Sequence, residues 1–418
     1  MGPRLGRDTR LLVAGQAVRA LGYGFSAVVL GALLSARHVG TVRTGALLAV
    51  LIGGSAGASL LVGAYADRFG RRRSYGLFFA GVALAGAVVA TSPPLWLLFV
   101  VAATGTLSTD VVDNGAATTL EQVMLAAEDA GTGRVYGWYN AAGAAFGSLG
   151  ALAAAVVGAT RHGAQVPAWL FVALVPVGIV GATCAARLST ATEATGDLTN
   201  SGGPDRRTTR LGTSRAAVRR LAGLFSIDAA GGGLVTTAFL SYYFAQRYGV
   251  SLAALGWLFF AVSAVQALSV LVAPLLARRV GLVTTMVGTH LPSNILLALI
   301  AFAPNFGIAA ALLVARTTLA QMDVPTRQAL VMTVVTPAER TAAAAETNAA
   351  RYSVRPFAPL VAGLLQQLSL GAPMVVAGVV KGSYDIALWR WAARVPVLRS
   401  NHFGPRPASS GPNQEERP

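Results

Sequence analysis

Apolar residues occur in long runs along this chain, and short polar turns separate the runs. No charged residue lies between Gly45 and Val62 or between Tyr75 and Ala90. A run of about 20 apolar residues can cross the hydrocarbon core of a bilayer as an α-helix, so the pattern predicts an all-α polytopic membrane protein. We expect twelve transmembrane helices, near residues 11–35, 45–65, 74–91, 95–122, 136–159, 167–187, 221–245, 252–276, 282–302, 306–329, 341–367 and 371–394.

Arginines are concentrated in alternate turns between these predicted helices, and this asymmetry predicts the orientation of the chain in the membrane. Loops that stay in the cytoplasm keep an excess of Lys and Arg. With the N-terminus inside, the outer loops carry only Arg37, Arg43, Arg161 and Arg247. The inner segments carry Arg4, Arg7, Arg10, Arg68, Arg71, Arg72, Arg73, Arg134, Arg187, Arg206, Arg207, Arg210, Arg215, Arg219, Arg220, Arg278, Arg279, Arg327, Arg340 and the C-terminal arginines. We therefore expect a multi-pass protein of the cytoplasmic (cell) membrane with both termini in the cytoplasm.

A polar segment divides the predicted helices into two groups of six. It is rich in Thr, Ser, Gly and Arg, which is typical of a flexible linker. The chain therefore divides into an N-terminal six-helix bundle (1–188), a cytoplasmic linker (189–220), a C-terminal six-helix bundle (221–396) and a disordered cytoplasmic tail (397–418).

The two groups of helices repeat one another at a spacing near 210 residues. Four landmarks recur in the same order: Arg19 with Asp228, residues 66–70 with 277–281, Asp113 with Asp323, and Asn140 with Asn348. A repeat of this kind places a substrate site at the interface of the halves, near the bilayer midplane.

Composition narrows the classes of function. The 418 residues are 54% hydrophobic and only 12% charged, with a mean hydropathy of +0.58. The net charge of +16 does not indicate nucleic acid binding, because the cations lie at the ends of the spans and not on one soluble face. The single cysteine, Cys184, allows no intrachain disulfide. The sequence shows no Walker phosphate loop, no metal-ligand spacing and no catalytic triad pattern, so we expect no catalytic residue, no metal and no cofactor, and we do not expect an enzyme.

The most specific motif is GAYADRFGRRRS at residues 63–74, between the second and third predicted helices. It resembles the loop 2–3 signature of the major facilitator superfamily, G-x-x-x-D-R-x-G-R-R-[RK]. Every fixed position is filled, by Gly63, Asp67, Arg68, Gly70, Arg71, Arg72 and Arg73. The resemblance covers about residues 10–396 and implies a secondary transporter of twelve helices, built as two six-helix halves that rock against each other. In the second half the signature is degenerate, because Arg278 stands where the first half has Asp67.

The resemblance also implies a role for the signature. In this superfamily the aspartate at the position of Asp67 meets the inner end of helix 11 and locks the outward-open state. The partner in this chain would lie near residues 341–346, which include Glu346. We therefore expect Asp67, Arg68, Arg71, Arg72 and Glu346 to form gating contacts; the alternative is that the motif is only a topological anchor.

Charged residues inside the predicted spans carry the rest of the functional prediction, because an ionisable group at bilayer depth costs at least about 2.5 kcal/mol unless it is paired or faces water. Asp110, Asp113 and Glu121 fall on one face of the fourth predicted helix, and Arg19 lies at a depth that allows an ion pair with Asp110 or Asp113. Asp113, then Asp110 and Asp228, are the candidates for proton coupling. A structural or gating pair that includes Arg19, and direct contact with substrate, stay open as alternatives.

The second half carries further charges. Asp323 and Arg327 read as a gating or packing pair near the inner surface, where Pro325 should kink or end the helix. Candidates for substrate contact are Arg316, Arg351, Arg355, Asn140 and Asn348. Arg351 or Arg355 could also be the partner of Asp228, whereas Lys381 and Asp385 are spaced to neutralise each other within helix 12. Buried arginines also permit an anionic substrate, since guanidinium binds carboxylate or phosphate through two hydrogen bonds.

Together these features predict proton-coupled movement of a small organic solute by alternating access. Efflux is favoured over uptake, because the site reads as roomy, mixed in charge and flanked by aromatic residues. The first alternative is an uptake symporter or facilitator for a metabolite anion, and the second is a non-transporting membrane sensor on the same fold. The expected partners are the small-molecule substrate, protons and the lipid bilayer, with no nucleic acid, and we expect a monomer.

Overall fold

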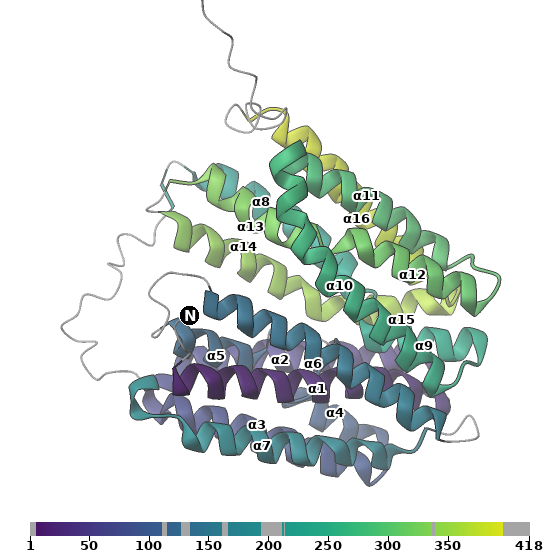
Figure 1. The fold of residues 1–418 in the computed structure, drawn as a ribbon. Helices are drawn as coiled ribbons and strands as arrows, with labels where there is room; N and C mark the ends of the chain where they lie inside the picture. Colours follow the sequence, from purple (N-terminus) through teal and green to yellow (C-terminus); the bar gives the residue numbers. More distant parts are fainter. Residues whose placement is uncertain are drawn as a thin grey trace, which may run out of the picture.

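The computed structural model describes residues 6–110, 115–126, 134–160, 166–193, 211–212, 214–336 and 339–395. These residues form helices joined by turns, and no strand occurs among them. Figure 1 shows two groups of helices, one above the other, with the second group running obliquely to the first. The predicted all-α class is confirmed.

The first group of helices, called here the N-terminal half, lies in the lower part of Figure 1. Its elements are α1 (Arg7–Ala36), α2 (Thr41–Phe69), α3 (Arg71–Ala90), α4 (Leu95–Ala103), α5 (Ala116–Ala126), α6 (Arg134–Ala159), the 3₁₀ helix η1 (Ala168–Ala173) and α7 (Leu174–Arg187). A short 3₁₀ helix, η2 (Thr190–Thr192), follows at the start of the linker. Helix α1 is buried along most of its length and packs against α6, α7 and α9, so it lies near the centre of the molecule.

The second group, called the C-terminal half, lies in the upper part of Figure 1. Its elements are α8 (Arg215–Gly233), α9 (Thr237–Tyr248), α10 (Leu252–Val280), α11 (Leu282–Ile300), α12 (Phe306–Ala320), α13 (Asp323–Val334), α14 (Arg340–Val354), the 3₁₀ helix η4 (Arg355–Phe357), α15 (Ala358–Leu368) and α16 (Ala372–Ala392).

Eight helices or helix pairs of the described chain are long and apolar enough to cross a membrane. The other predicted spans are also present as helices, but most are interrupted. The span expected at 95–122 is divided into α4 and α5, the span at 306–329 into α12 and α13, and the span at 341–367 into α14, η4 and α15. The last span is the continuous helix α16, whose charged residues Lys381 and Asp385 lower its mean hydropathy.

The prediction of one continuous helix at 95–122 is wrong, and this error affects the candidate site most. Residues 104–110 are not helical, and Gly105 adopts a left-handed backbone with φ of +70°. A Cβ atom on Gly105 would lie 2.5 Å from the carbonyl oxygen of Gly54, so only glycine fits there. Ser108 Oγ bonds the backbone of Asp110, at 3.1 Å from its N–H and 3.0 Å from its oxygen, and such local bonds compete with helix formation. Asp110 and Glu121 therefore do not share one helix face, and Asp113 lies outside the described residues.

Breaks occur in three other predicted spans. Residues 234–236 separate α8 from α9, and the Thr236 side chain accepts a bond from the N–H of Phe239 at 3.3 Å, which caps the new helix. The chain leaves the helix after Ala320 and re-enters it at Asp323, just before Pro325, whose ring clashes with the carbonyl four residues earlier. Pro356 lies in the 3₁₀ turn η4, as expected for a helix loosened by proline.

The two ends of the helix bundle differ, and we name them by their loops. The end where α1 begins and α7 finishes is the linker end; the opposite end, with the turn at 37–40, is the far end. The halves approach closely at the far end, where α1 packs on α9, α2 on α15 and α6 on α10. A Cβ atom on Gly45 would lie 2.4 Å from the oxygen of Pro359 and 2.8 Å from the Cα of Gly363. In Figure 1 the halves diverge from this contact toward the linker end.

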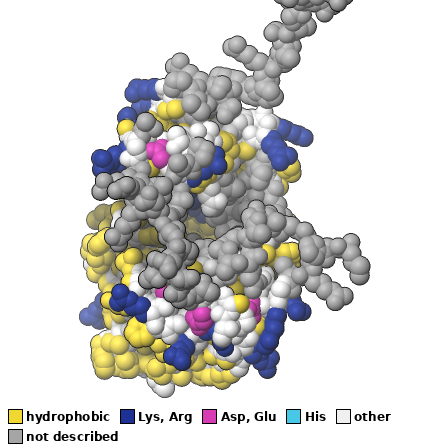
Figure 2. Space-filling model, turned by 90° about the vertical axis from the view of Figure 1, so that its left-hand side faces the viewer, with side chains coloured by type: hydrophobic (Ala, Val, Ile, Leu, Met, Phe, Trp, Pro, Cys, Tyr) yellow, Lys and Arg dark blue, Asp and Glu magenta, His cyan; other side chains and the backbone are white. Residues whose placement is uncertain are grey.

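Charge is distributed unequally between the two ends. Figure 2 looks onto the linker end and shows Lys and Arg side chains around its rim, with hydrophobic side chains covering the flank. The exposed arginines near the linker-end termini of the described helices include Arg68, Arg73, Arg215, Arg219 and Arg278. The far-end turns carry Arg37, Arg43 and Arg247 in the described chain. An apolar flank with one cationic end is the surface expected of a membrane protein.

Candidate functional site

Asp110 joins the two halves near the middle of the molecule. One carboxylate oxygen accepts a bond from Arg355 Nη2 at 2.6 Å, and the other accepts from the backbone N–H of Thr237 at 3.0 Å. Beside it, the N–H of Ala238 donates to the oxygen of Thr109 at 2.9 Å. The break in the fourth predicted span therefore contacts the break in the seventh. Each break leaves backbone N–H or C=O groups that a continuous helix would bond within itself, and these groups bond across the two halves instead.

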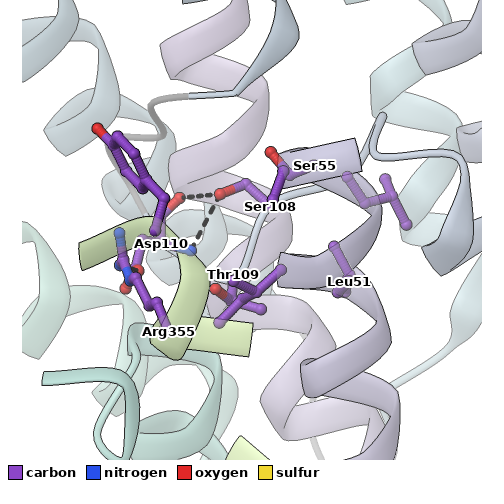
Figure 3. Close-up of a pocket in the computed structure, with 10 residues that line it drawn as sticks. Leu51, Ser55, Ser108, Thr109, Asp110 and Arg355 are labelled. Atoms are coloured by element: carbon purple, nitrogen blue, oxygen red, sulfur yellow. Dashed lines mark hydrogen bonds and ion pairs between the residues drawn. The ribbon is translucent and has the colours of Figure 1, made fainter. Parts of the chain in front are cut away.

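A pocket opens beside this ion pair, as Figure 3 shows. Leu51 and Ser55 of α2 form one wall, and the non-helical segment with Ser108 and Asp110 forms another. Tyr352 and Arg355 close it from the C-terminal half. The side chains of Asp110 and Arg355 stay 22% and 31% exposed, so the inter-half bond is reachable by water. The pocket thus has both a charged and an apolar side.

A second ion pair lies inside the N-terminal half. Arg19 Nη2 is 2.7 Å from Glu121 Oε2, and Glu121 is fully buried. Glu121 also accepts from the hydroxyls of Tyr75 at 2.5 Å and Tyr139 at 2.6 Å. The expected partner of Arg19 was Asp110 or Asp113, and for Asp110 this is wrong: the break after α4 carries Asp110 away, and Glu121 of α5 takes its place. A buried carboxylate with three donors is a satisfied structural pair.

The C-terminal half holds a larger buried cluster around Asp228. This carboxylate bonds Lys381 Nζ, lies 3.3 Å from Arg327 Nη1 and 3.7 Å from His290 Nε2. Arg327 also bonds Asp323 Oδ2 at 2.8 Å, which fits the predicted pairing of these two residues. The expectation that Asp228 pairs with Arg351 or Arg355 is wrong, because Arg355 is held by Asp110 and Lys381 reaches Asp228 from α16.

Asp385 belongs to the same cluster but has different partners. His290 Nδ1 lies 2.8 Å from one of its oxygens, and Asn294 Nδ2 donates to the other at 2.8 Å. The expected neutralisation of Lys381 by Asp385 within α16 is therefore wrong, because each finds a partner on a neighbouring helix. His290 bridges the two carboxylates, with one ring nitrogen toward Asp385 and the other toward Asp228.

The ion pairs of the two halves are related with reversed charge. In the N-terminal half the cation is on the first helix, Arg19, and the carboxylate is Glu121. In the C-terminal half the carboxylate is on the first helix, Asp228, and the cation is Arg327. The sequence repeat already aligned Arg19 with Asp228, and the structure adds partners at matching places.

Arg316 and Arg351 differ from the other cations of the C-terminal half. No hydrogen bond or ion pair joins either guanidinium to any part of the chain that the structure describes, and the Nε atoms of both are buried without a partner. Both act electrostatically with Asp228 and Asp323. Asn140 and Asn348, the other predicted substrate contacts, are exposed.

The signature segment lies at the linker end. Asp67 Oδ1 bonds Arg71 Nε at 2.7 Å, and Arg72 Nη2 donates to the oxygen of Ala186 at 3.1 Å, while Arg68 is exposed. The predicted contact of Asp67 with residues 341–346 concerns the state in which the linker end closes, so it stays a prediction. Glu346 lies 4.0 Å from Arg219, with both side chains exposed.

Two acidic residues that the sequence did not single out bind the two ends of the linker. Glu193 accepts from the backbone N–H groups of Arg71 at 2.6 Å and Arg72 at 3.3 Å, which caps the N-terminus of α3. Glu339 accepts from the N–H of Gly212 and from Thr336 Oγ1 at 3.0 Å. Hydrogen bonds from Ser214 and Gly212 lower the pKa of Glu339 below its ordinary value.

His290, Asn294, Glu193 and Glu339 carry structural or electrostatic roles that sequence reasoning missed. A histidine inside an apolar span was the available signal for His290. Glu193 and Glu339 gave no such signal, because an acidic residue in a polar loop is ordinarily solvated. Within the described residues, no group of three or more His, Cys, Asp or Glu side chains could hold a metal ion.

Comparison with known proteins gives a family match and structures of similar fold. The family model of the Major Facilitator Superfamily matches residues 12–359. An uncharacterized membrane protein of Saccharomyces cerevisiae is 25% identical over 393 residues, covering 86% of this chain and 88% of the relative.

Solved structures of similar fold include the nucleoside transporter NupG, at 13% identity and a TM-score of 0.70 over 93% of this chain and 99% of that one. Another is the xylose transporter XylE from E. coli, at 13% identity and a TM-score of 0.70 over 92% and 98% of the two chains. At these identities the likeness shows a shared fold.

Proposed function

The chain belongs to the Major Facilitator Superfamily, and from this premise we propose that it exports a small organic solute across the cytoplasmic membrane in exchange for protons. The family match and the apolar helices make the chain a multi-pass membrane protein of a transporter family. The direction of transport and the coupling to protons are the proposal.

The orientation supports this proposal. The linker end carries the cationic rim, and loops rich in arginine stay in the cytoplasm. The linker end and both chain termini would therefore face the cytoplasm. With this orientation, the packing of the halves at the far end supports an inward-facing state of an alternating-access cycle. The proposal includes a protein that acts as a monomer.

The observation that carries the proposal is the bond between Asp110 and Arg355. It joins the two halves at 2.6 Å beside a pocket, at the base of their far-end contact. Opening toward the outside must separate this pair and the bond from Thr237, because their partners belong to opposite halves. The carboxylate at the gate therefore changes its surroundings in every cycle.

This separation gives a route for coupling. In the outward-open state Asp110 would lose its cation and face external water, and it takes up a proton there because an unpaired charge at membrane depth is costly. When the halves close again, Arg355 favours the carboxylate, so the proton leaves toward the cytoplasm. One proton then enters for each cycle, and its gradient drives the solute outward.

The other proton-coupling candidates fit this scheme less well. Asp228 holds two cations and a histidine inside one half, so a rocking motion of the halves does not by itself separate it from them. Asp113 lies outside the described residues, and its coupling role stays a prediction. Asp110 is therefore the residue that the inter-half geometry supports best.

The proposal is tested in inside-out vesicles with an imposed pH gradient and a fluorescent pH probe. A panel of drugs, sugars and organic anions is added to vesicles with wild-type protein, with Asp110→Asn or with Asp8→Asn. We expect one compound class to collapse the gradient for wild type and for Asp8→Asn, whose carboxylate bonds Ser189 at the linker end, but not for Asp110→Asn.

Other results would identify the alternatives. Solute accumulation that follows the proton inward would indicate an uptake symporter, and solute flux without any proton movement would indicate a facilitator. If no compound is moved under either gradient, the non-transporting sensor becomes the better reading. If Asp110→Asn exchanges protons as well as wild type does, the gate is not the coupling site.

A further inference from the structure

Among the residues that the structure describes, the C-terminal half has more cations at membrane depth than its carboxylates can neutralise. The Asp228 carboxylate is paired with Lys381 and Arg327, and the Asp323 carboxylate is paired with Arg327. Asp385 is occupied by His290 and Asn294. Within the described residues, Arg316 and Arg351 are left without a bonded carboxylate.

Counting charges makes this surplus explicit. The cluster has the carboxylates Asp228, Asp323 and Asp385, and the permanent cations Arg316, Arg327, Arg351 and Lys381. With a neutral His290 the described part of the cluster carries one unbalanced positive charge, and a protonated His290 would add another. A positive charge at membrane depth costs at least about 2.5 kcal/mol unless an anion or water compensates it.

The two unbonded guanidiniums come from different helices. Arg316 comes from α12 and Arg351 from α14, and both act electrostatically with the same two carboxylates, Asp228 and Asp323. Both residues are partly exposed, although their Nε atoms are buried. Both guanidiniums therefore act on the same two carboxylates, and neither arginine is fully buried.

Arg351 is the sequence neighbour of Tyr352, which lines the pocket between the halves. Arg351 lies one helical turn before Arg355, and residues four apart on a helix are neighbours. Tyr352 and Arg355 line the pocket, and the Tyr352 side chain is 40% exposed. An oxyanion held by Arg351 could thus belong to a molecule whose apolar part rests against Tyr352 and Leu51.

We propose that Arg316 and Arg351 bind the anionic group of the transported solute, so that the substrate is an organic oxyanion. Guanidinium is suited to this task, because its planar fork donates two parallel hydrogen bonds to a carboxylate or phosphate. The inference rests on the proposed transport function and deepens it by naming the class of substrate. Bound solute would supply the negative charge that the described cluster lacks.

The test measures binding to the purified full-length protein, independently of transport. Matched probes share a scaffold and differ in charge: benzoate, benzamide and benzylamine, then phenyl phosphate and phenol, and glucose 6-phosphate and glucose, with inorganic phosphate alone as a further arm. The readouts are the rise in melting temperature with probe concentration and the dissociation constant from titration calorimetry.

We expect anionic probes to raise the melting temperature, whereas their neutral and cationic counterparts do not. Arg316→Gln and Arg351→Gln should each weaken anion binding at least tenfold, and Arg316→Lys and Arg351→Lys should weaken it less. Arg219→Gln is the matched control, because Arg219 is exposed at the linker end. If a glutamine variant fails to fold, the lysine variant at the same position replaces it in the binding test.

Several results would overturn the inference. Equal binding of neutral and anionic probes, no stabilisation by any anion in the panel, or unchanged anion affinity in both glutamine variants would each do so. Asp113→Asn is included because Asp113 lies outside the described residues. If this variant alone creates anion binding, Asp113 is the counter-ion of the arginines, and the solute is not.

The outcome separates this inference from the proposed function. Anion binding that depends on Arg316 and Arg351, without proton exchange in vesicles, would leave the site standing and remove proton-coupled export. Exchange of a neutral or cationic solute for protons, with no anion binding, would leave export standing and remove the anion site. The carboxylate and phosphate arms decide which oxyanion is preferred.

Discussion

Asp110 and Arg355 lie 245 positions apart in the chain and bond at 2.6 Å, each from a different half of the molecule. Asp110 can form this bond because the fourth span is broken at this depth. Arg355 can form it because its helix ends in a 3₁₀ turn that contains Pro356. The two irregular segments therefore create the main polar contact described between the halves near the bilayer centre.

Removing this contact should favour the outward-open state. A hydrogen bond to a charged group contributes about 1.5–3 kcal/mol, so Arg355→Gln should shift the balance of states by about tenfold or more. The measurement is labelling from outside by an impermeant maleimide at Ala32→Cys, a position 3% exposed at the far end, in a chain whose Cys184 is changed to Ser. The charge-reversed pair Asp110→Arg with Arg355→Asp should restore slow labelling. Equal labelling rates in all variants would show that the pair does not hold the far end closed.

Glycine packing should control the same equilibrium without any change of charge. A Cβ atom on Gly363 would lie 2.6 Å from the oxygen of Thr41, so Gly363→Ala pushes α15 away from α2. We expect faster outside labelling at Ala32→Cys than in the parent chain. Gly57→Ala is the control, because a Cβ atom there meets no atom within 4 Å. A similar effect of both substitutions would argue against specific packing at the far end.

The Arg19–Glu121 pair should be structural. Glu121→Gln leaves the buried Arg19 without its counter-charge, and breaking such a pair by removing one partner costs about 3–5 kcal/mol. The expected result is a large fall in melting temperature in detergent. Glu346→Gln serves as the control, since its exposed pair with Arg219 at 4.0 Å should contribute less than about 1 kcal/mol. Replacing both residues, Arg19→Met with Glu121→Leu, should recover much of the loss; failure to recover would mean that Glu121 does more than neutralise Arg19.

Glu193 should anchor the first residues of the linker to the signature segment. Glu193→Gln removes the negative charge that caps the N-terminus of α3, and a cap contributes about 1 kcal/mol. Hydrogen exchange of the Arg71 and Arg72 amides should become faster, together with proteolysis of the linker near residue 193. Arg68→Gln, an exposed neighbour, should leave the exchange of these amides unchanged. Unchanged exchange in Glu193→Gln would show that the cap does not hold α3.

Attachment of the other linker end should depend on pH. The pKa of Glu339 is lowered by hydrogen bonds that require its charged form, so the folded contact binds fewer protons than the free carboxyl does. The contact is therefore fully stabilising above the ordinary pKa of 4.5 and is lost as the pH falls below it, through the lowered pKa. Protection of the Gly212 amide, corrected for intrinsic exchange, should fall in that acidic range, and Glu339→Gln should remove most of this pH dependence. Constant protection in wild type across the range would contradict the assignment.

Much of the architecture follows from local pattern. The apolar runs, the alternation of arginine-rich turns and the signature at Gly63–Ser74 indicated the helices and the family, because hydrophobic length and loop charge are properties of short segments. The position of Pro325 likewise indicated an interruption in the span predicted at 306–329. The repeat predicted that Arg19 and Asp228 occupy matching places, which agrees with their reversed ion pairs.

The partners of the charged residues depended on tertiary structure. The sequence places Asp110, Glu121, Asp228 and Lys381 at membrane depth, but several opposite charges lie at similar depth on other helices, so depth alone leaves many pairings open. In the N-terminal half the break after α4 determined the pairing. Because of this break Asp110 pairs with Arg355, and Arg19 pairs with Glu121. Such a break depends on the close approach of Gly105 to Gly54 of another helix. Local pattern determined which segments are helices and which residues are charged, and the packing of distant helices decided where helices break and which charges meet.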